Sequence, residues 1–128
     1  MCNNIIMKLN FDKLVKQETI NLRYKSLYDE FEVIIKILRD KNAVIKKLNL
    51  YYNDITLADG KFTHALANNN TLEVLHLYDN SIGVEGTKCL AAALVKNNTL
   101  RELDLTSNNI GEAGAKYLAE ALKECTNL

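Results

Sequence analysis

The sequence predicts an α/β repeat fold: a short right-handed solenoid with a parallel β-sheet on its concave face and α-helices on its convex face. Three observations lead to this prediction. A motif recurs along the chain with a period of about 27–28 residues, within the range of known solenoid repeats. Each copy begins with the alternating apolar residues of a short strand and continues with the spacing of an amphipathic helix. A single unit of this kind cannot bury its own apolar face, so neighbouring copies must stack.

The repeat is clearest in the second half of the chain. "LEVLHLYDNSIGVEG" begins at Leu72, and "LRELDLTSNNIGEAG" begins at Leu100. "IKKLNLYYNDI" from Ile45 matches at nearly the same offset, and "QETINLRYKSL" from Gln17 is a degenerate copy one further period back. We therefore expect a repeat domain over 17–128, with repeats at about 17–44, 45–71, 72–99 and 100–128.

The shared core L-x-x-L-x-L-x-x-N-x-I resembles a leucine-rich repeat, for which periods of about 20–29 residues are typical. The repeat length, the trailing Gly-x-x-Gly and the helical second half resemble the ribonuclease-inhibitor-like subclass. The resemblance covers about residues 17–128. It implies a segment of a horseshoe, and it implies protein binding, because the same subclass supplies repeat domains to intracellular immune receptors.

The first half of each copy is expected to form a strand whose alternate residues enter the core. In the third and fourth copies the inward positions are Leu75, Leu77, Leu103 and Leu105. An asparagine amide can both donate to and accept from backbone groups in a tight turn, and the family stacks such amides after its strands. The resemblance therefore implies a structural asparagine ladder of Asn53, Asn80 and Asn108.

The second half of each copy is expected to form a helix of about three turns, because its apolar residues lie three and four positions apart. The predicted inward stripes are Phe31, Ile34, Ile35 and Leu38; Phe62, Ala65 and Leu66; Val84, Leu90, Ala91 and Leu94; and Ala115, Leu118, Ala119 and Leu122. Gly86 and Gly114 allow the start of a helix to approach the loop behind it.

Both ends of the chain differ from the repeat. Residues 1–16 are expected to form an N-terminal cap, with a short helix from about Phe11. Its apolar cover would be Ile5, Ile6, Leu9, Phe11, Leu14 and Val15. "CTNL" at 125–128 aligns with "NNTL" at 97–100, so the chain stops on the first leucine of a fifth repeat. Either a longer array continues there, or another molecule, including a second copy, covers the open edge.

Composition excludes several classes of function. Lys plus Arg is 16 and Asp plus Glu is 16, which argues against nucleic-acid binding, since such a protein would be basic. The longest apolar run near the start, at 5–7, is too short for a signal peptide or a membrane span. An odd number of cysteines, 3, without a CxxC pair fits a reduced chain, so we expect a cytoplasmic protein. The Asn-x-Thr sequons at Asn69 and Asn97 are interpreted as coincidental.

No catalytic, cofactor-binding or metal-binding residues are predicted. The sequence contains no HExxH, GxSxG or Walker motif, and its two histidines fall in different halves of adjacent repeats. The Gly-x-x-Gly segments recur at the repeat period, so we interpret them as helix packing and not as phosphate cradles. We therefore expect that the protein is not an enzyme.

The candidate binding surface is the concave face, where outward strand positions form rows that begin at Thr19, Asn21 and Arg23, with a further row beyond them that begins at Tyr24. The predicted partner-binding residues are Arg23, Tyr24, Lys47, Asn49, Tyr51, Tyr52, Val74, His76, Tyr78, Asp79, Glu102, Asp104 and Thr106. Four of them are tyrosines, which suit protein recognition because each combines a large contact area with a polar group. The alternative is that aromatic residues are simply favoured on strands.

Charge follows a gradient along the same face. Residues 1–64 carry 11 basic and 8 acidic side chains, a net charge of +3, and residues 65–128 carry 5 and 8, a net charge of −3. Arg23 and Lys47 lie at one end, with Asp79, Glu102 and Asp104 at the other. A partner of opposite polarity would be steered into register. The alternative is that these charges only solvate an exposed face.

The sequence therefore predicts a non-enzymatic module that binds another protein, but neither nucleic acid nor membrane, through the concave sheet. Two alternatives remain. One is a regulator of a small GTPase, since Ran GTPase-activating proteins share this subclass, although no motif of theirs can be transferred residue by residue. The other is a structural protein that assembles with its own copies through the open C-terminal repeat edge.

Overall fold

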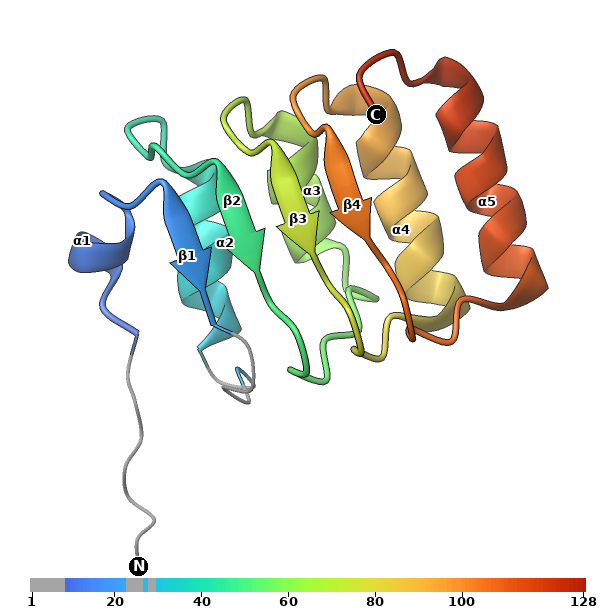
Figure 1. Cartoon of the computed structure of the whole chain (residues 1–128), viewed down its shortest axis with the longest axis horizontal. Helices are drawn as coiled ribbons and strands as arrows, with labels where there is room; N and C mark the ends of the chain where they lie inside the picture. Colours follow the sequence, from blue (N-terminus) through green and yellow to red (C-terminus); the bar gives the residue numbers. More distant parts are fainter. Residues whose placement is uncertain (1–8, 23–26, 28–29) are drawn as a thin grey trace, which may run out of the picture.

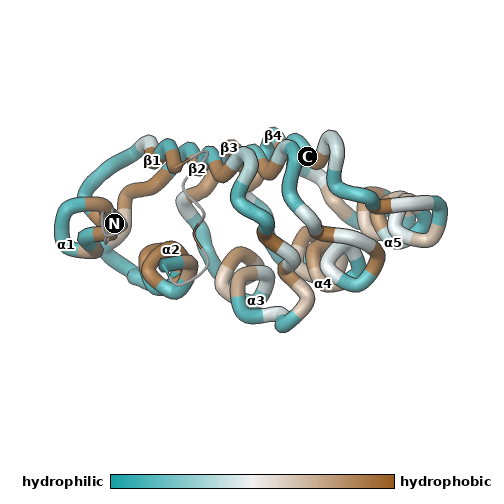
Figure 2. Tube along the Cα trace, turned by 90° about the horizontal axis from the view of Figure 1, so that it is seen from below, coloured by the Kyte–Doolittle hydropathy of each residue, from teal (hydrophilic) through white to brown (hydrophobic). Residues whose placement is uncertain are grey.

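The computed structural model describes residues 9–22, 27 and 30–128. In this part of the chain, strands β1 (Thr19–Asn21), β2 (Lys47–Asn49), β3 (Val74–His76) and β4 (Glu102–Asp104) form one sheet in the order β1-β2-β3-β4. The helices are α1 (Phe11–Leu14), α2 (Phe31–Arg39), α3 (Lys61–Asn68), α4 (Gly83–Lys96) and α5 (Gly111–Glu124). The sheet forms one layer and α2–α5 form a second layer behind it (Figure 1, Figure 2).

All neighbouring strands are parallel, and their register follows the repeat. Ile20 pairs with Leu48, Leu48 with Leu75, and Leu75 with Leu103. Helices α2, α3 and α4 each connect two adjacent parallel strands, as expected for β/α units stacked in sequence order. This arrangement confirms the α/β solenoid that the repeat period predicted. We call the sheet face turned away from the helices the concave face.

The core lies between the two layers. Leucines at the inward strand positions are buried in the inner repeats, including Leu48, Leu75 and Leu77. Phe31 and Phe62 stack with their ring centroids 5.2 Å apart and fill the space between α2 and α3. Leu103 and Leu105 also point into the core, but they are only partly buried, because no described repeat covers β4 on its far side.

The predicted helix stripes are buried or partly buried in α2, α3 and most of α4, and they are wrong at Val84 and at most positions of α5. Val84 is 38% exposed, because Ile82 and Gly86 take the buried positions at the start of α4. A Cβ atom at Gly86 would collide with the backbone carbonyl of Thr56, so the close approach requires glycine. In α5, Ala115, Ala119 and Leu122 are exposed and Leu118 is only partly buried.

Two sets of buried asparagines brace the turns at opposite ends of the strands. After β3, the Asn80 amide donates to the carbonyls of Leu50 and Leu77 and accepts from the N–H groups of Asn53 and Ile55, at 2.8–3.0 Å. Asn53 and Asn108 are also buried and donate to backbone carbonyls of their own and the preceding repeat. Each amide thus joins two repeats through groups that would otherwise be buried without partners.

The second set lies between each helix and the next strand. Asn69 donates to the Leu38 carbonyl, and Asn97 donates to the carbonyls of Leu66 and Asn69. Their side-chain oxygens accept from backbone N–H groups two and three residues ahead. This role was missed in the sequence, although the recurrence of N-x-T-L at the repeat period indicates it. The sequons are therefore part of the fold, and both asparagine side chains are buried.

The N-terminal end of the sheet is covered by α1. Leu9, Phe11, Leu14 and Val15 are partly buried against the core, and the helix begins near Phe11 as expected. The Lys36 ammonium lies 4.4 Å from the centre of the Phe11 ring. The predicted cap residues Ile5 and Ile6 lie outside the described residues.

Candidate functional site

The predicted binding residues lie on the concave face or directly after its strands. The outward positions of β2, β3 and β4 are occupied by Lys47, Asn49, Val74, His76, Glu102 and Asp104. The loops that follow these strands contain Tyr51, Tyr52, Tyr78, Asp79 and Thr106. Arg23 and Tyr24 lie outside the described residues. Each of these strands is three residues long, so its first and last residues face outward, and paired residues of neighbouring strands form rows across the sheet.

Three tyrosines come together just after the C-terminal ends of β2 and β3, and we call Tyr51, Tyr52 and Tyr78 the tyrosine cluster. The Tyr78 ring meets Tyr51 and Tyr52 edge to face, with centroids 5.4 and 5.5 Å apart. Tyr51 also stacks on the His76 ring at 5.8 Å. Tyr51 and Tyr78 are half-buried and Tyr52 is exposed, so the rings support one another and still present surface to solvent.

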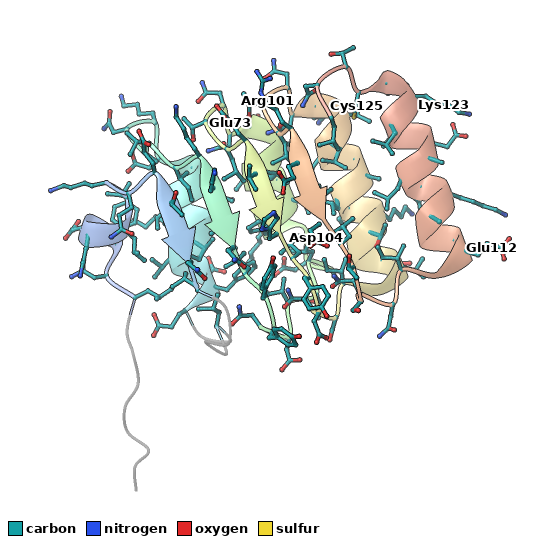
Figure 3. The ribbon with its side chains drawn as sticks, in the orientation of Figure 1. Glu73, Arg101, Asp104, Glu112, Lys123 and Cys125 are labelled. Atoms are coloured by element: carbon teal, nitrogen blue, oxygen red, sulfur yellow. The ribbon has the colours of Figure 1, made fainter. Side chains whose placement is uncertain are left out.

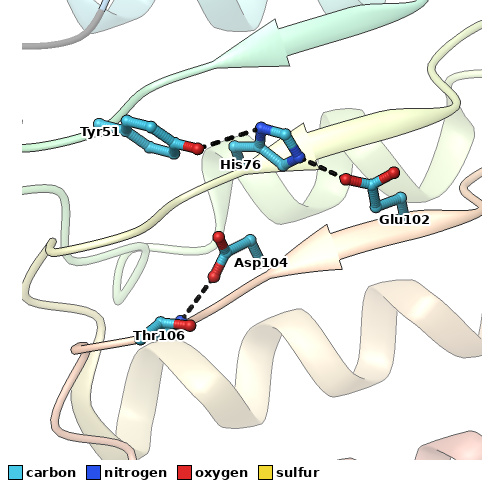
Figure 4. A network of polar contacts seen from close by, with 5 residues as sticks. All are labelled: Tyr51, His76, Glu102, Asp104 and Thr106. Carbon is cyan, nitrogen blue, oxygen red and sulfur yellow. Dashed lines mark hydrogen bonds and ion pairs between the residues drawn. The ribbon is translucent and has the colours of Figure 1, made fainter.

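A polar network extends from this cluster across the sheet (Figure 4). The Tyr51 hydroxyl lies 3.5 Å from His76 Nδ1, and His76 Nε2 lies 2.6 Å from Glu102 Oε1. A neutral imidazole with its proton on Nε2 satisfies both contacts, since it donates to the carboxylate and accepts from the hydroxyl. The network therefore holds the His76 ring between β2 and β4.

Asp104 lies beside this network and accepts a hydrogen bond from the backbone N–H of Thr106 at 3.0 Å. That bond lowers the pKa of Asp104 below its ordinary value, against an opposing effect of burial, and the proximity of His76 lowers it further. Asn49, the residue of β2 in the same row, accepts from the Tyr51 N–H at 3.3 Å in the same way. The residue before the turn therefore supplies an acceptor on both β2 and β4, and the acceptor on β4 is charged.

Among the described residues of the concave face, basic and acidic side chains lie toward opposite ends of the sheet, as the charge gradient of the sequence predicts. Lys47 is exposed on β2, and Glu102 and Asp104 lie on β4. Figure 3 shows Asp104 at the sheet and Glu112 and Lys123 on α5, so the α5 ion pairs do not belong to this face. Among the ion pairs of the described chain, none joins a lysine or arginine to Glu102, Asp104 or Asp79.

A hollow of about 160 Å³ lies next to Lys47. It is lined by Thr19, Asn21, Lys47, Leu48, Asn49, Val74 and His76. Its rim thus combines amide and hydroxyl groups with an ammonium. The sequence placed Thr19 and Asn21 in the outward rows but could not show that the rows enclose a hollow.

Metal ligands do not gather in the described chain. No group of three or more His, Cys, Asp or Glu side chains that could hold a metal ion occurs within residues 9–22, 27 and 30–128. In the same part of the chain, every helix is too short or too polar to cross a membrane.

Comparisons with known proteins agree with the repeat fold. The family model described as Leucine Rich repeat matches residues 68–91 and 96–119. A solved structure titled "Leiomodin-1 Actin-Binding Site 2 (ABS2)" is similar with a TM-score of 0.75 and 24% sequence identity, over 92% of this chain and 70% of that chain. No curated protein sequence matches. Residues 68–91 and 96–119 thus match leucine-rich repeats, and the chain has the fold of a short α/β leucine-rich-repeat solenoid.

Proposed function

We propose that the chain is a non-enzymatic protein-interaction module that binds a protein partner through its concave face. The tyrosine cluster carries this proposal, because its rings gather on the outer side of the sheet and not in the core. Tyrosine is enriched among the residues that dominate binding energy, and pre-packed rings lose little side-chain entropy on binding. Among the described residues no helix covers this face (Figure 2), so the sheet offers a broad, rigid support for such contacts.

The polar network supports binding better than catalysis. The hydrogen-bonded series Tyr51–His76–Glu102 has the order of residues found in a proton relay. However, it lies across an open sheet face where water can surround it. Preorganised catalytic groups are effective mainly in sites that exclude water. The network instead holds the edge of the tyrosine cluster in place, which lowers the cost of ordering these side chains when a partner binds.

Self-assembly through β4 is less favoured by the charges at that edge. In an antiparallel pair of β4 strands centred on Leu103, Glu102 of one copy would lie opposite Asp104 of the other. Like charges directly opposite each other destabilise a strand pair. The open edge of β4 is therefore a poor surface for a symmetric dimer.

The test compares the wild-type protein with a Tyr51→Ala, Tyr78→Ala double variant and a Tyr117→Ala control. Tyr117 is 39% exposed on α5, so its removal deletes a similar ring from the helical layer. Each protein is immobilised and exposed to purified actin and to lysate of its native cells. Actin is the first defined candidate, because the similar structure is described as an actin-binding site.

We expect at least one protein to be retained by the wild type and by Tyr117→Ala and to be lost from the double variant. Equal retention by all three proteins contradicts binding through the concave face. Thermal unfolding is measured first, so that loss of binding is not loss of fold. If the double variant does not fold, the more exposed Tyr52→Ala replaces it.

A further inference from the structure

We propose that the concave face binds a dipolar segment of its partner, in which a carboxylate and a cationic side chain lie about 10 Å apart. The carboxylate contacts Lys47, and the cationic group contacts Glu102 and Asp104. This inference rests on the proposed function, because it describes the partner's chemistry at the same face.

The basic end of the face is built to hold a carboxylate. Lys47 is exposed and lines the hollow together with Asn21, Asn49 and Thr19. An ammonium, amide N–H groups and a hydroxyl can all donate to the two oxygens of a carboxylate. Within the described chain, Lys47 forms no ion pair, so its charge remains available to a partner.

The acidic end is built to hold a cation. Glu102 and Asp104 are two positions apart on β4, so both side chains point to the concave face. The Glu102 carboxylate accepts one hydrogen bond from His76, and the Asp104 carboxylate accepts one from the Thr106 N–H. Each carboxylate therefore has further lone pairs that can accept hydrogen bonds from a partner. Arginine suits this end best, since its planar group can bind a carboxylate in a bidentate manner and stack on a tyrosine ring.

The register sets the separation of the two ends. Lys47 pairs with Val74, and Val74 pairs with Glu102, so Lys47 and Glu102 are two strands apart. At about 4.8 Å per strand, the backbone positions of Lys47 and Glu102 are about 10 Å apart. About seven residues of a helix, or about three of a polyproline II segment, span this distance and return to the same side. Val74 lies between the charges, so the middle of the partner segment meets an apolar surface.

The first experiment selects peptides from a random display library on the wild-type protein. We expect acidic and basic residues to be enriched together, at separations of about three or about seven positions. The selection is repeated on Lys47→Gln and on a Glu102→Gln, Asp104→Asn variant. These amides still accept the hydrogen bonds of His76 and Thr106, as Asn49 already does from Tyr51, so charge is removed without removing the turn.

Each neutralised variant should lose one half of the pattern. Lys47→Gln should lose the acidic enrichment only, and the acidic-end variant should lose the basic enrichment only. For one selected peptide, calorimetry should show binding about 2- to 5-fold weaker for either variant. A control variant, Glu112→Gln and Lys116→Gln, removes an exposed ion pair of α5 and should leave both enrichment and affinity unchanged.

The outcomes separate this inference from the proposed function. If peptides depend on Tyr51 and Tyr78 but show no paired charges, the dipolar partner is overturned and the binding face stands. If peptides bind the Tyr51→Ala, Tyr78→Ala variant as well as the wild type, both proposals fail. Recovery of no peptide above background, or of peptides with like charges at both positions, also overturns the dipolar partner.

Discussion

The third repeat (72–99) and the fourth repeat (100–128) have nearly the same apolar pattern but very different burial. Leu94 in α4 is 2% exposed, whereas Leu122, its equivalent in α5, is 47% exposed. Leu77 after β3 is fully buried, whereas Leu105 after β4 is only partly buried. In the described chain, β3 and α4 have neighbours on both sides and β4 and α5 on one side only (Figure 1).

Burial in a stacked fold therefore depends on the neighbouring repeat as well as on the residue. A leucine contributes transfer free energy, about 25 cal/mol per Å² of apolar surface, only where the next repeat removes it from water. Equivalent positions in the two repeats therefore form matched pairs, in which the residue type is the same and the burial of the side chain differs.

The largest contrast is expected between Leu94→Ala and Leu122→Ala. Leu94→Ala should cost about 2–5 kcal/mol, since it opens a cavity in the core. Leu122→Ala should change stability by no more than about 1 kcal/mol, because Leu122 is already 47% exposed and leucine and alanine have similar helix propensities. Urea unfolding followed by circular dichroism measures both. Equal losses would contradict the difference in burial between α4 and α5.

A smaller contrast is expected between Asn80→Ala and Asn108→Ala. Asn80→Ala should cost roughly 1–3 kcal/mol, because it leaves buried backbone groups of two repeats without partners. Asn108→Ala should cost less, because the carbonyls of Leu105 and Thr106 lie at the open end and can bind water. The free energy of unfolding of each variant is compared with that of Asn98→Ala, an exposed control. A greater loss for Asn108→Ala would be inconsistent with this explanation.

The second asparagine set offers a substitution that should stabilise the fourth repeat. Cys125 stands where the third repeat has Asn97, and its thiol contacts the Leu94 carbonyl at 3.2 Å. Cys125→Asn should donate to the same carbonyl and accept from the N–H groups ahead of it, with a gain of about 0.5–1.5 kcal/mol. The melting temperature of this variant is compared with that of Cys125→Ala. A lower value for asparagine than for alanine would rule out the equivalence.

The smallest effect concerns the charged acceptor of the fourth repeat. Because the Thr106 N–H lowers the pKa of Asp104 in the folded state, ionised Asp104 favours folding. This contribution is present above the ordinary pKa of 3.8 and is lost as pH falls through the lowered folded value. The stability difference between wild type and Asp104→Asn should therefore shrink between neutral pH and about pH 3. A difference independent of pH would show that the carboxylate charge is not involved.

Much of the fold could be predicted from the sequence, because the same strand-and-helix pattern occurs in several copies along the chain. Leu75 and Leu103, or Ile82 and Ile110, recur at a spacing that only a stack of equivalent units explains. The outward rows followed directly, since strand residues alternate between faces. Burial at Val84 and along α5 was predicted wrongly, because apolar periodicity identifies a helix face but not what covers it.

The candidate site was predictable in composition but not in contacts. The sequence placed Tyr51, Tyr78 and His76 on one face, and the strand register followed from the period. Tyr51 stacks on the His76 ring, and Glu102 contacts His76 Nε2. These contacts depend on the side-chain rotamers, which are set by packing across three strands. The second asparagine set was missed for a similar reason, because Asn69 and Asn97 act on the carbonyls of Leu38 and Leu66 in preceding helices.

The sequence by itself determined the period, the strand and helix halves of each repeat, and the residues that share a face, since all three follow from local geometry. Only the tertiary structure decided which of those faces are buried, which side chains meet across strands, and which charges of the concave face pair within the described chain. The physical reason is that these properties depend on contacts between neighbouring repeats. The residues of one repeat do not specify which side chains of the next repeat will pack against them.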